Sequence, residues 1–340
     1  MLKYAFWNNK GGTGKTSLAF QCITEYAVTH PNERILVADV CPQANISELF
    51  LGGLTNNGSK KLLERQGATP RASIGGYFQM RLPSPYAMPT SVDFNAFLTH
   101  PVEFNRAIPD NIDLICGDPL LELQANAINT LANNQIPGTE TWIAVIDWLA
   151  DLLSLTRDRY DVVFLDCNPS FSVYTQIAIA TADRLVLPVM ADDSSRRAVQ
   201  NALSLVYGLM LPSPIYTTYA FSTKLRAAGR TLPKVHLIAK NRLTQYMGPA
   251  SAYAAVLNSV DRDIRQLITS HPDLFTFSTT KNGTVDIRDF QTTGVVAFAR
   301  GVPFGVLRAG KQDIGGHRVE VKEDYRQLCL EAVQDMVRTL

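Results

Sequence analysis

No long hydrophobic run and no excess of one charge occur in this sequence of 340 residues. No stretch reaches the roughly 18 apolar residues that a membrane-spanning helix needs. The acidic residues in and next to the segment 321–340 disfavour an anchor on the membrane surface, so no membrane partner is expected. The 32 lysines and arginines nearly balance the 31 acidic residues. This balance excludes a globally basic coat for nucleic acid but leaves room for a local basic patch. The N-terminus lacks the cleavage pattern of a signal peptide.

Cysteine is scarce and scattered, with five residues and no Cys-x-x-Cys pair. An odd number of cysteines at wide spacing predicts neither a zinc knuckle nor a frame of disulfides. We therefore expect reduced thiols and a cytoplasmic location.

Short apolar runs alternate with longer mixed segments, which predicts β-strands and α-helices in turn. The run Val162–Leu165 is continuous, as in strands that are buried on both faces of a parallel sheet. The expected fold class is α/β, with a mostly parallel central sheet and helices on both faces. The predicted strands are Lys3–Trp7, Arg34–Asp39, Asn111–Cys116, Asp161–Asp166, Arg184–Met190 and Val235–Lys240.

Three segments rich in Gly, Pro, Asn or Ser break this alternation, at about 52–110, 211–233 and 270–294. Long loops in a compact domain are usually functional. We interpret them as irregular insertions in a single domain that spans residues 1–340. Apolar residues at helical spacing predict helices at Lys15–Val28, Thr141–Thr156, Val173–Ala182, Ser195–Met210, Ala250–Ile268 and Val321–Leu340.

The clearest motif is the polar segment 8–16, between a predicted strand and a predicted helix. Its glycines let backbone N–H groups point inward around an oxyanion, and the helix N-terminus adds partial positive charge. Lys15 would reach the β- and γ-phosphates, and the Thr16 hydroxyl would ligate Mg²⁺. A chance glycine-rich turn would not have this strand-and-helix context, so the segment is predicted to be a phosphate-binding loop.

The loop departs from the usual pattern at two positions. Asn9 stands where the first glycine normally is, and an additional lysine, Lys10, precedes Gly11 and Gly12. Taken alone, Lys10 is equally well explained as a solvated surface charge or as a functional group.

This loop resembles that of the ParA/MinD family of deviant-Walker-A P-loop ATPases, and the resemblance covers most of the chain. Residues 10–16 match the deviant loop, 37–45 the second family motif, 160–170 the Walker B strand and 182–189 the next strand. The turn 301–304 is similar to a late Gly-x-Pro turn of the family. Residues Pro42, Gln43 and Asn45 favour the ParA-type partition ATPases over MinD and the nitrogenase iron protein.

The resemblance implies a switch that uses ATP and Mg²⁺, closes as a homodimer, binds DNA nonspecifically and responds to an activating partner protein. Association with the nucleoid would follow from DNA binding. Lys10 would then cross the dimer interface to the phosphates of the other subunit. The candidates for DNA contacts, which are equally well explained as surface charges for solubility, are Arg226, Arg230, Lys234, Lys240 and Arg242.

The resemblance and the residues together give three sets of site residues. Catalytic roles are expected of Lys10, Lys15, Asp39 and Cys41. Contacts with Mg²⁺ are expected of Thr16, Asp39 and Asp166, because the two aspartates end predicted strands, where open α/β sheets place ligands. Contacts with the nucleotide are expected of Lys10, Gly11, Gly12, Thr13, Gly14, Lys15, Thr16, Ser17, Asn241, Arg242 and Pro303. Asn241 would read the adenine edge, and Arg242 would either stack on the base or form a surface ion pair.

At Cys41 the sequence departs from the family, which has an aspartate there to orient and deprotonate the attacking water. A neutral thiol accepts a hydrogen bond from water only weakly. We expect Cys41 to be protonated at neutral pH, because nearby phosphate charge raises the pKa of a thiol. Either hydrolysis is slow, or another carboxylate takes the role, with Asp39, Asp192 and Asp193 as candidates.

The leading hypothesis is therefore a ParA-like nucleotide switch with ATPase activity, which would be slow if no other carboxylate replaces Cys41 as the base. One alternative is an ATP-binding scaffold that does not hydrolyse ATP, which Cys41 favours. Another is a P-loop amidoligase or synthetase with an acceptor site in the segment 52–110, although Pro42 and Gln43 favour the ParA group. No Asn-Lys-x-Asp motif follows the strand Val235–Lys240, which argues against a GTPase.

Overall fold

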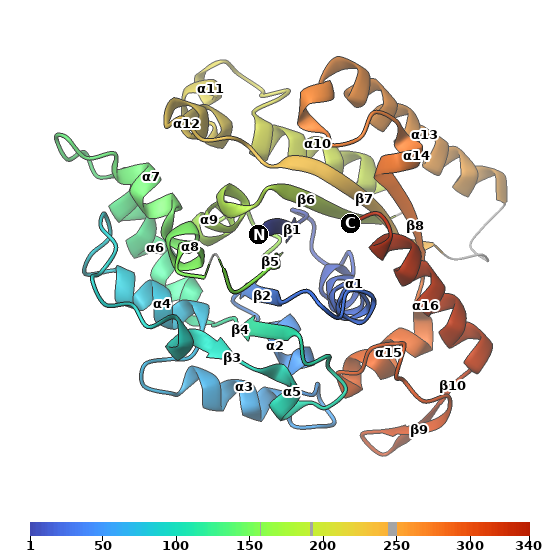
Figure 1. Ribbon diagram of the computed structural model, residues 1–340. Coiled ribbons are helices and arrows are strands. Elements are labelled where there is room, and N and C mark those ends of the chain that lie inside the picture. Colours follow the sequence, from blue (N-terminus) through green and yellow to red (C-terminus); the bar gives the residue numbers. More distant parts are fainter. Residues whose placement is uncertain (157, 191–192, 244–249) are drawn as a thin grey trace.

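A twisted sheet of eight strands lies at the centre of the computed structural model, which describes residues 1–156, 158–190, 193–243 and 250–340 (Figure 1). The strand order is β3-β4-β2-β5-β1-β6-β7-β8, and every neighbouring pair is parallel except β3 with β4. The hairpin of β9 and β10 stands apart. The strands are β1 (Leu2–Phe6), β2 (Ile35–Val40), β3 (Leu98–Thr99), β4 (Ile112–Ile115), β5 (Val162–Cys167), β6 (Arg184–Met190), β7 (Lys234–Leu243), β8 (Thr284–Arg288), β9 (Gly310–Ile314) and β10 (His317–Val321).

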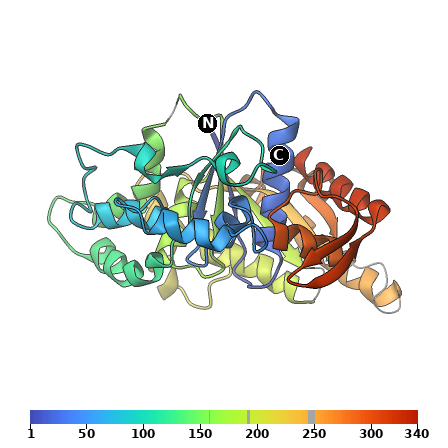
Figure 2. The same cartoon turned by 90° about the horizontal axis from the view of Figure 1, so that it is seen from below.

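Helices cover both faces of the sheet (Figures 1 and 2). Most of one face packs against α4, α6 to α10, α12 and α13, and the other packs against α1, α2, α15 and α16. The helices are α1 (Lys15–Thr29), α2 (Asn45–Phe50), α3 (Gly58–Gln66), α4 (Ile74–Arg81), α5 (Pro101–Phe104), α6 (Leu120–Asn133), α7 (Thr141–Ile146), α8 (Trp148–Ser154), α9 (Val173–Thr181), α10 (Asp193–Tyr207), α11 (Ile215–Tyr219), α12 (Phe221–Ala227), α13 (Ala250–Ser270), α14 (Thr280–Gly283), α15 (Gln291–Arg300) and α16 (Glu323–Val337). Two short 3₁₀ turns lie at Phe94–Phe97 and Pro272–Leu274.

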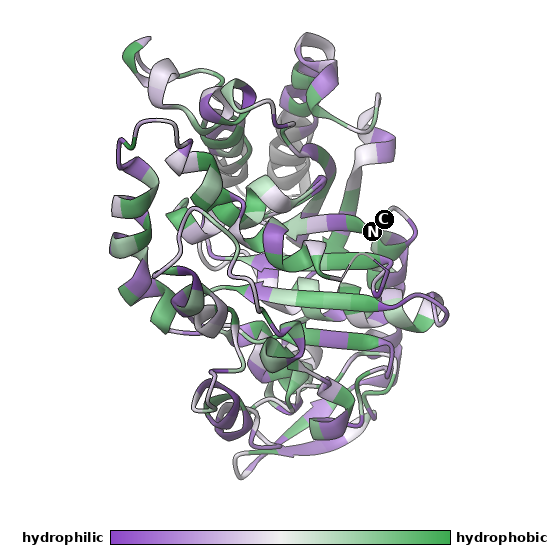
Figure 3. Ribbon diagram, turned by 60° about the vertical axis from the view of Figure 1, so that its left-hand side comes forward, coloured by the Kyte–Doolittle hydropathy of each residue, from purple (hydrophilic) through white to green (hydrophobic). Residues whose placement is uncertain are grey.

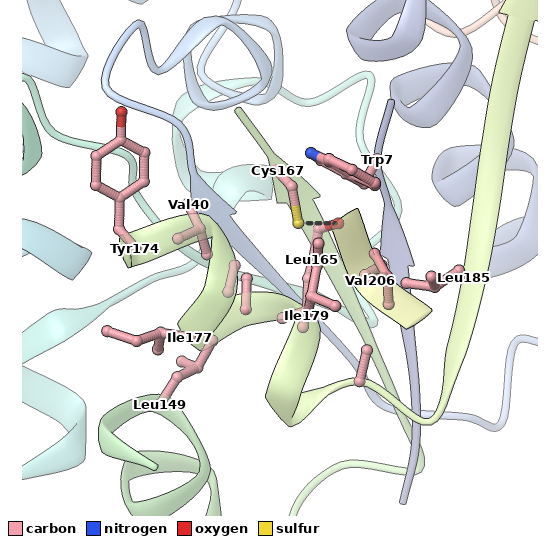
Figure 4. Close-up of a cluster of buried hydrophobic side chains, with 14 of the residues drawn as sticks. Trp7, Val40, Leu149, Leu165, Cys167, Tyr174, Ile177, Ile179, Leu185 and Val206 are labelled. Carbon is pink, nitrogen blue, oxygen red and sulfur yellow. Dashed lines mark hydrogen bonds between the residues drawn. The ribbon is translucent and has the colours of Figure 1, made fainter. Parts of the chain in front are cut away.

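Alternation along each strand sends side chains into two separate cores. Tyr4 and Phe6 of β1 pack on the side of α1 and α16, whereas Ala5 and the following Trp7 pack on the side of α9. Figure 4 shows Trp7 in that second core with Cys167 at the end of β5. Figure 3 shows how strongly hydrophobic the strands are, as expected of a sheet covered on both faces.

The six predicted strands are all present, and the predicted fold class is confirmed. The predicted helix Thr141–Thr156 is instead two helices, α7 and α8, which meet at Asp147. The last helix, α16, begins at Glu323, two residues after its predicted start, because Val321 is the last residue of strand β10.

The three predicted insertions contain regular structure. The segment 52–110 carries α3, α4, α5 and the edge strand β3, the segment 211–233 carries α11 and α12, and the segment 270–294 carries strand β8. Their apolar residues are few, but several aromatic residues of the first segment are buried in the core, namely Tyr77, Phe78, Phe94 and Phe97. No helix in the described ranges is both long and apolar enough to cross a membrane.

The strand order brings three loops together at one edge of the sheet. Strands β2, β5 and β1 are neighbours, so the residues that follow them lie side by side. These are Cys41 after β2, Asn168 after β5 and the glycine-rich loop after β1. The two chain ends lie at the opposite edge (Figures 2 and 3).

Candidate functional site

The glycine-rich loop between β1 and α1 is shaped by glycine conformation and by one buried amide. Gly12 and Gly14 have φ angles of 75° and 74°, which favour glycine. Asn8 is buried; its Nδ2 donates to the carbonyl of Pro188 at 2.5 Å, and its Oδ1 accepts from the backbone N–H of Lys10 at 3.0 Å. Asn8 therefore ties the start of the loop to strand β6, a role that its sequence context did not reveal.

The N-terminus of α1 faces a polar hollow. Among the described residues, no side chain caps this helix, and its first turn holds no acidic group. The backbone N–H groups and the helix dipole therefore favour an anion here. The hollow measures about 220 Å³ and is lined by Lys10, Gly12, Thr13, Gly14, Lys15, Thr16, Ser17, Cys41, Gln43, Asn45 and Pro169. The structure thus brings Cys41 together with all the predicted loop residues except Gly11, and adds Gln43, Asn45 and Pro169.

Lys15 and Asp166 form a buried ion pair beneath this hollow, with the two side chains 6% and 1% exposed. Burial opposes the charge on Lys15, but the Asp166 carboxylate and its hydrogen bond raise the pKa of Lys15 above its usual value. The hydroxyl of Thr16 donates to the other oxygen of Asp166 at 3.4 Å. Lysine, threonine and aspartate therefore meet where the loop touches the end of β5.

Asp39 lies directly opposite Asp166 in the register of β2 and β5, and it is fully buried. Its Oδ2 accepts from the backbone N–H of Ser47 at 3.1 Å and from the Ser47 hydroxyl at 2.7 Å. Its Oδ1 accepts from the backbone N–H of Cys41 at 3.1 Å. Burial and the neighbouring Asp166 carboxylate raise the pKa of Asp39, and the hydrogen bonds from Ser47 oppose that rise.

The oxygen atoms of Thr16, Asp39 and Asp166 are a donor set that fits Mg²⁺, which prefers oxygen ligands and retains water and phosphate oxygens. In the described ranges, no cluster of three or more histidine, cysteine or acidic side chains could hold a metal ion alone.

Cys41 is 5% exposed and lines the hollow beside Lys15 and Thr16. Burial, followed by the charges of Asp39 and Asp166, raises the pKa of the Cys41 thiol to about 12. The thiol is thus protonated at neutral pH and is a weak hydrogen-bond acceptor. Of the other carboxylates considered for its role, Asp39 is held by Ser47, Asp192 lies outside the described residues, and so does the side chain of Asp193.

A second, larger cavity of about 780 Å³ shares Gly14 and Ser17 with the phosphate hollow and also contains Asn241. Its remaining lining is mostly apolar, with Phe290 and Phe298 among the residues. Asn241 donates from Nδ2 to the carbonyl of Thr13 at 2.8 Å, so part of its amide already supports the loop.

Pro303 lies between α15 and β9, next to residues that contact Gln21 in the middle of α1. The flanking residues Val302 and Phe304 both bond to the side chain of Gln21, and Pro303 lines neither cavity. The side chain of Arg242 lies outside the described part of the chain.

The predicted DNA contacts fall into different environments. The prediction for Lys240 is wrong, because its side chain is buried and pairs with Asp261 at 2.6 Å and Asp286 at 3.6 Å. Arg230 is half-exposed but pairs with Asp147 at 2.7 Å. Arg226 and Lys234 are exposed and stay candidates.

The parallel sheet, the loop between β1 and α1 and the Lys15–Asp166 pair define a P-loop nucleotide-binding fold. The AAA_31 family model, described as an AAA domain, matches residues 1–209, and the chain belongs to this family.

Relatives and solved structures agree with this placement. The virulence plasmid ParA family protein of Chlamydia psittaci is 26% identical over 192 residues, which are 55% of this chain and 56% of that protein. The chain spans about half the length of the curated relatives that it matches, including an uncharacterized protein of Mycobacterium tuberculosis at 24% identity.

Two solved structures share the fold at low identity. An aspartate-to-alanine variant of McdA from Cyanothece in complex with ATP has a TM-score of 0.62 and 14% identity, covering 100% of this chain and 96% of that one. A plasmid partition protein from Borrelia burgdorferi bound to AMPPNP has a TM-score of 0.54 and 15% identity, covering 100% of this chain and 99% of that one.

Proposed function

We propose that the chain is an ATP-dependent switch of the ParA type that closes as a homodimer and hydrolyses ATP slowly. The observation that carries this proposal is that the buried Cys41, rather than a carboxylate, lines the hollow beside Lys15 and Thr16, where burial raises the pKa of its thiol. The similar fold of ATP and AMPPNP complexes supports ATP as the ligand.

In this proposal, the backbone N–H groups from Gly12 to Thr16 hold the phosphates, and Lys15 leaves Asp166 to bind the β- and γ-phosphate oxygens. Thr16, Asp39 and Asp166 would hold Mg²⁺, which neutralises phosphate charge when it is bound. Water beside the γ-phosphate meets Cys41, which is too weak an acceptor to take its proton. The ATP-bound state is therefore long-lived.

Lys10 lies on the rim of the phosphate hollow, and we propose that it acts across the dimer interface. A cation that reaches the phosphates of the other subunit would make closure depend on the γ-phosphate. The closed dimer would bind duplex DNA through exposed basic residues and respond to a partner protein.

The oligomeric state tests this function directly. Light scattering after size exclusion should give the monomer mass of 37.5 kDa with ADP and twice that mass with ATP and Mg²⁺. Lys10→Ala should bind ATP as the wild type does but form less dimer. Lys311→Ala, an exposed lysine on β9, is the matched control. The same mass with every nucleotide would contradict the proposal.

Cys41 also favours a second candidate, a scaffold that binds ATP and never hydrolyses it. The two functions differ in one measurement, the release of phosphate over hours at saturating ATP. Steady release above the Lys15→Ala background supports the slow switch, and no release supports the scaffold.

A further inference from the structure

Ser47, near the start of α2, makes two hydrogen bonds to a single oxygen of Asp39. Its backbone N–H and its hydroxyl both reach Oδ2, at 3.1 and 2.7 Å, and both residues are fully buried. Two donors occupy the lone pairs of Oδ2, and Cys41 N–H takes one of those on Oδ1. Oδ1 is therefore the oxygen of Asp39 that retains capacity for a bound cation or its water.

The direction of the Ser47 hydroxyl is fixed by Gly117. The N–H of Gly117 donates to Ser47 Oγ at 2.9 Å, so the single hydroxyl hydrogen of Ser47 points to Asp39. A Cβ on Gly117 would lie 2.8 Å from the Asp39 carboxyl group and 2.8 Å from Ala44. Glycine is thus the residue that lets the end of β4 approach the carboxylate.

The segment 66–73, which belongs to a predicted insertion, bonds to Gly117 and Asp118 on the side away from Asp39. Gln66 donates to the carbonyl of Gly117 at 2.9 Å. The next residue, Asp118, is fully buried and accepts two hydrogen bonds from Arg71, both at 2.9 Å, and one from the Ser73 hydroxyl at 2.6 Å. A charged bidentate pair of this kind is geometrically specific.

We propose that Ser47 is the positioning residue that orients Asp39 toward Mg²⁺, and that the segment 66–73 sets its place through Gly117 and Asp118. This inference rests on the proposed Mg²⁺–ATP site. Partners that orient a metal-binding carboxylate change metal affinity when they are lost, because the carboxylate gains alternative positions. The segment 66–73 would thereby be mechanically coupled to the nucleotide site.

Titration of Mg²⁺ at fixed ATP, followed by calorimetry, tests the role of Ser47. Ser47→Ala should raise the Mg²⁺ concentration needed for half-saturation by about tenfold and leave ATP affinity in EDTA unchanged. Ser47→Thr, which keeps the hydroxyl, should restore the wild-type value. Ser222→Ala removes another buried serine hydroxyl, on α12, and should change neither measurement.

Arg71→Ala removes both Arg71 hydrogen bonds to Asp118, and the Arg71 side chain is one-third exposed, so this variant tests the coupling even if Ser47→Ala does not fold. Its half-saturation should lie between those of the wild type and Ser47→Ala. An unchanged Mg²⁺ requirement in Ser47→Ala or Arg71→Ala, or no rescue by Ser47→Thr, overturns this inference but leaves the proposed function in place. A wild type that binds no ATP with or without Mg²⁺ overturns the proposed function as well.

Discussion

The ammonium group of Lys15 pairs with the carboxylate of Asp166 at the end of β5, with both side chains almost completely buried. Under the proposed function each group exchanges its partner when Mg²⁺–ATP binds. Lys15 turns to the phosphates, and Asp166 turns to the ion. The pair therefore holds two ligand-binding groups in place before the ligand arrives and avoids an uncompensated buried charge.

Lys15→Ala should abolish ATP binding, because the phosphates lose their central cation. It should also lower the thermal midpoint, since Asp166 would keep a buried charge without its partner, at a cost of about 3 kcal/mol. Calorimetry with ATP and Mg²⁺ measures the first effect, and thermal melting measures the second. Lys234→Ala removes an exposed lysine and serves as the control. Retained micromolar affinity in Lys15→Ala would contradict the assignment of the phosphate loop.

Much of this site could be predicted because its signals are local. The spacing of glycines between a predicted strand and a predicted helix is enough to predict the phosphate loop from Asn8 to Thr16. Asp39 and Asp166 each end an apolar run, which predicts the edge of the sheet on which they lie. Their direct opposition depends on the pairing of β2 with β5, and no local pattern reveals which strands pair.

The contacts that were missed are long-range. Ser47 and Gly117 are 70 positions apart and meet only because β4 lies next to β2. The sequence predicts that Lys240 lies at the surface, but the side chain is buried and pairs with Asp261 of α13 and Asp286 of β8, both distant in sequence. Strand β3 has only two residues, too few to show a period.

We expect the protonation of His236 to lower the stability of the fold in acid. Burial and the charge of Arg184 lower its pKa to about 4. The neutral ring is held by Thr276, at 2.7 Å from Nδ1, and by the carbonyl of Thr339, at 2.9 Å from Nε2. The unfolded chain takes up a proton near pH 6.5, before the folded chain does, so this contribution is complete above that pH and is lost toward pH 4.

Between pH 7 and 5, His236→Gln should therefore lose less free energy of unfolding than the wild type, by about 1 kcal/mol after allowance for partial exposure. Urea unfolding at the two pH values measures the difference. His317→Gln, on the exposed hairpin strand β10, should behave like the wild type. If the wild type and His236→Gln lost the same free energy of unfolding, protonation of His236 would not contribute to the loss of stability in acid.

Duplex DNA retention should require ATP and fall steeply with salt. If Arg226 contacts a phosphate, Arg226→Glu should weaken binding on every sequence and reduce the slope of log affinity against log salt by about 1. Anisotropy of a labelled duplex over a salt series measures both quantities. Arg308→Glu makes the same charge change before β9, far from α12 in the fold (Figure 1), and should have less effect. DNA binding that is equally tight with and without ATP would argue against the switch.

Cys41→Asp should accelerate ATP turnover by about 100-fold, because a carboxylate accepts the proton of the attacking water and a protonated thiol does not. Phosphate release at saturating ATP and Mg²⁺, with and without duplex DNA, is the measurement. Cys41→Ser gives a neutral acceptor of similar size and should stay near the wild-type rate. Calorimetry should show that both variants still bind ATP.

If Cys41→Asp does not accelerate turnover, the general base is another residue of the site. If the wild type already turns over quickly and Cys41→Asp changes little, Cys41 is not the brake, and another carboxylate positions the water. Asp39 is poorly suited to that task in this structure, because Ser47 and the Cys41 N–H already bond to its two oxygens. Asp192→Asn and Asp193→Asn would then be the decisive pair, since only the variant that removes the base should abolish phosphate release while ATP stays bound.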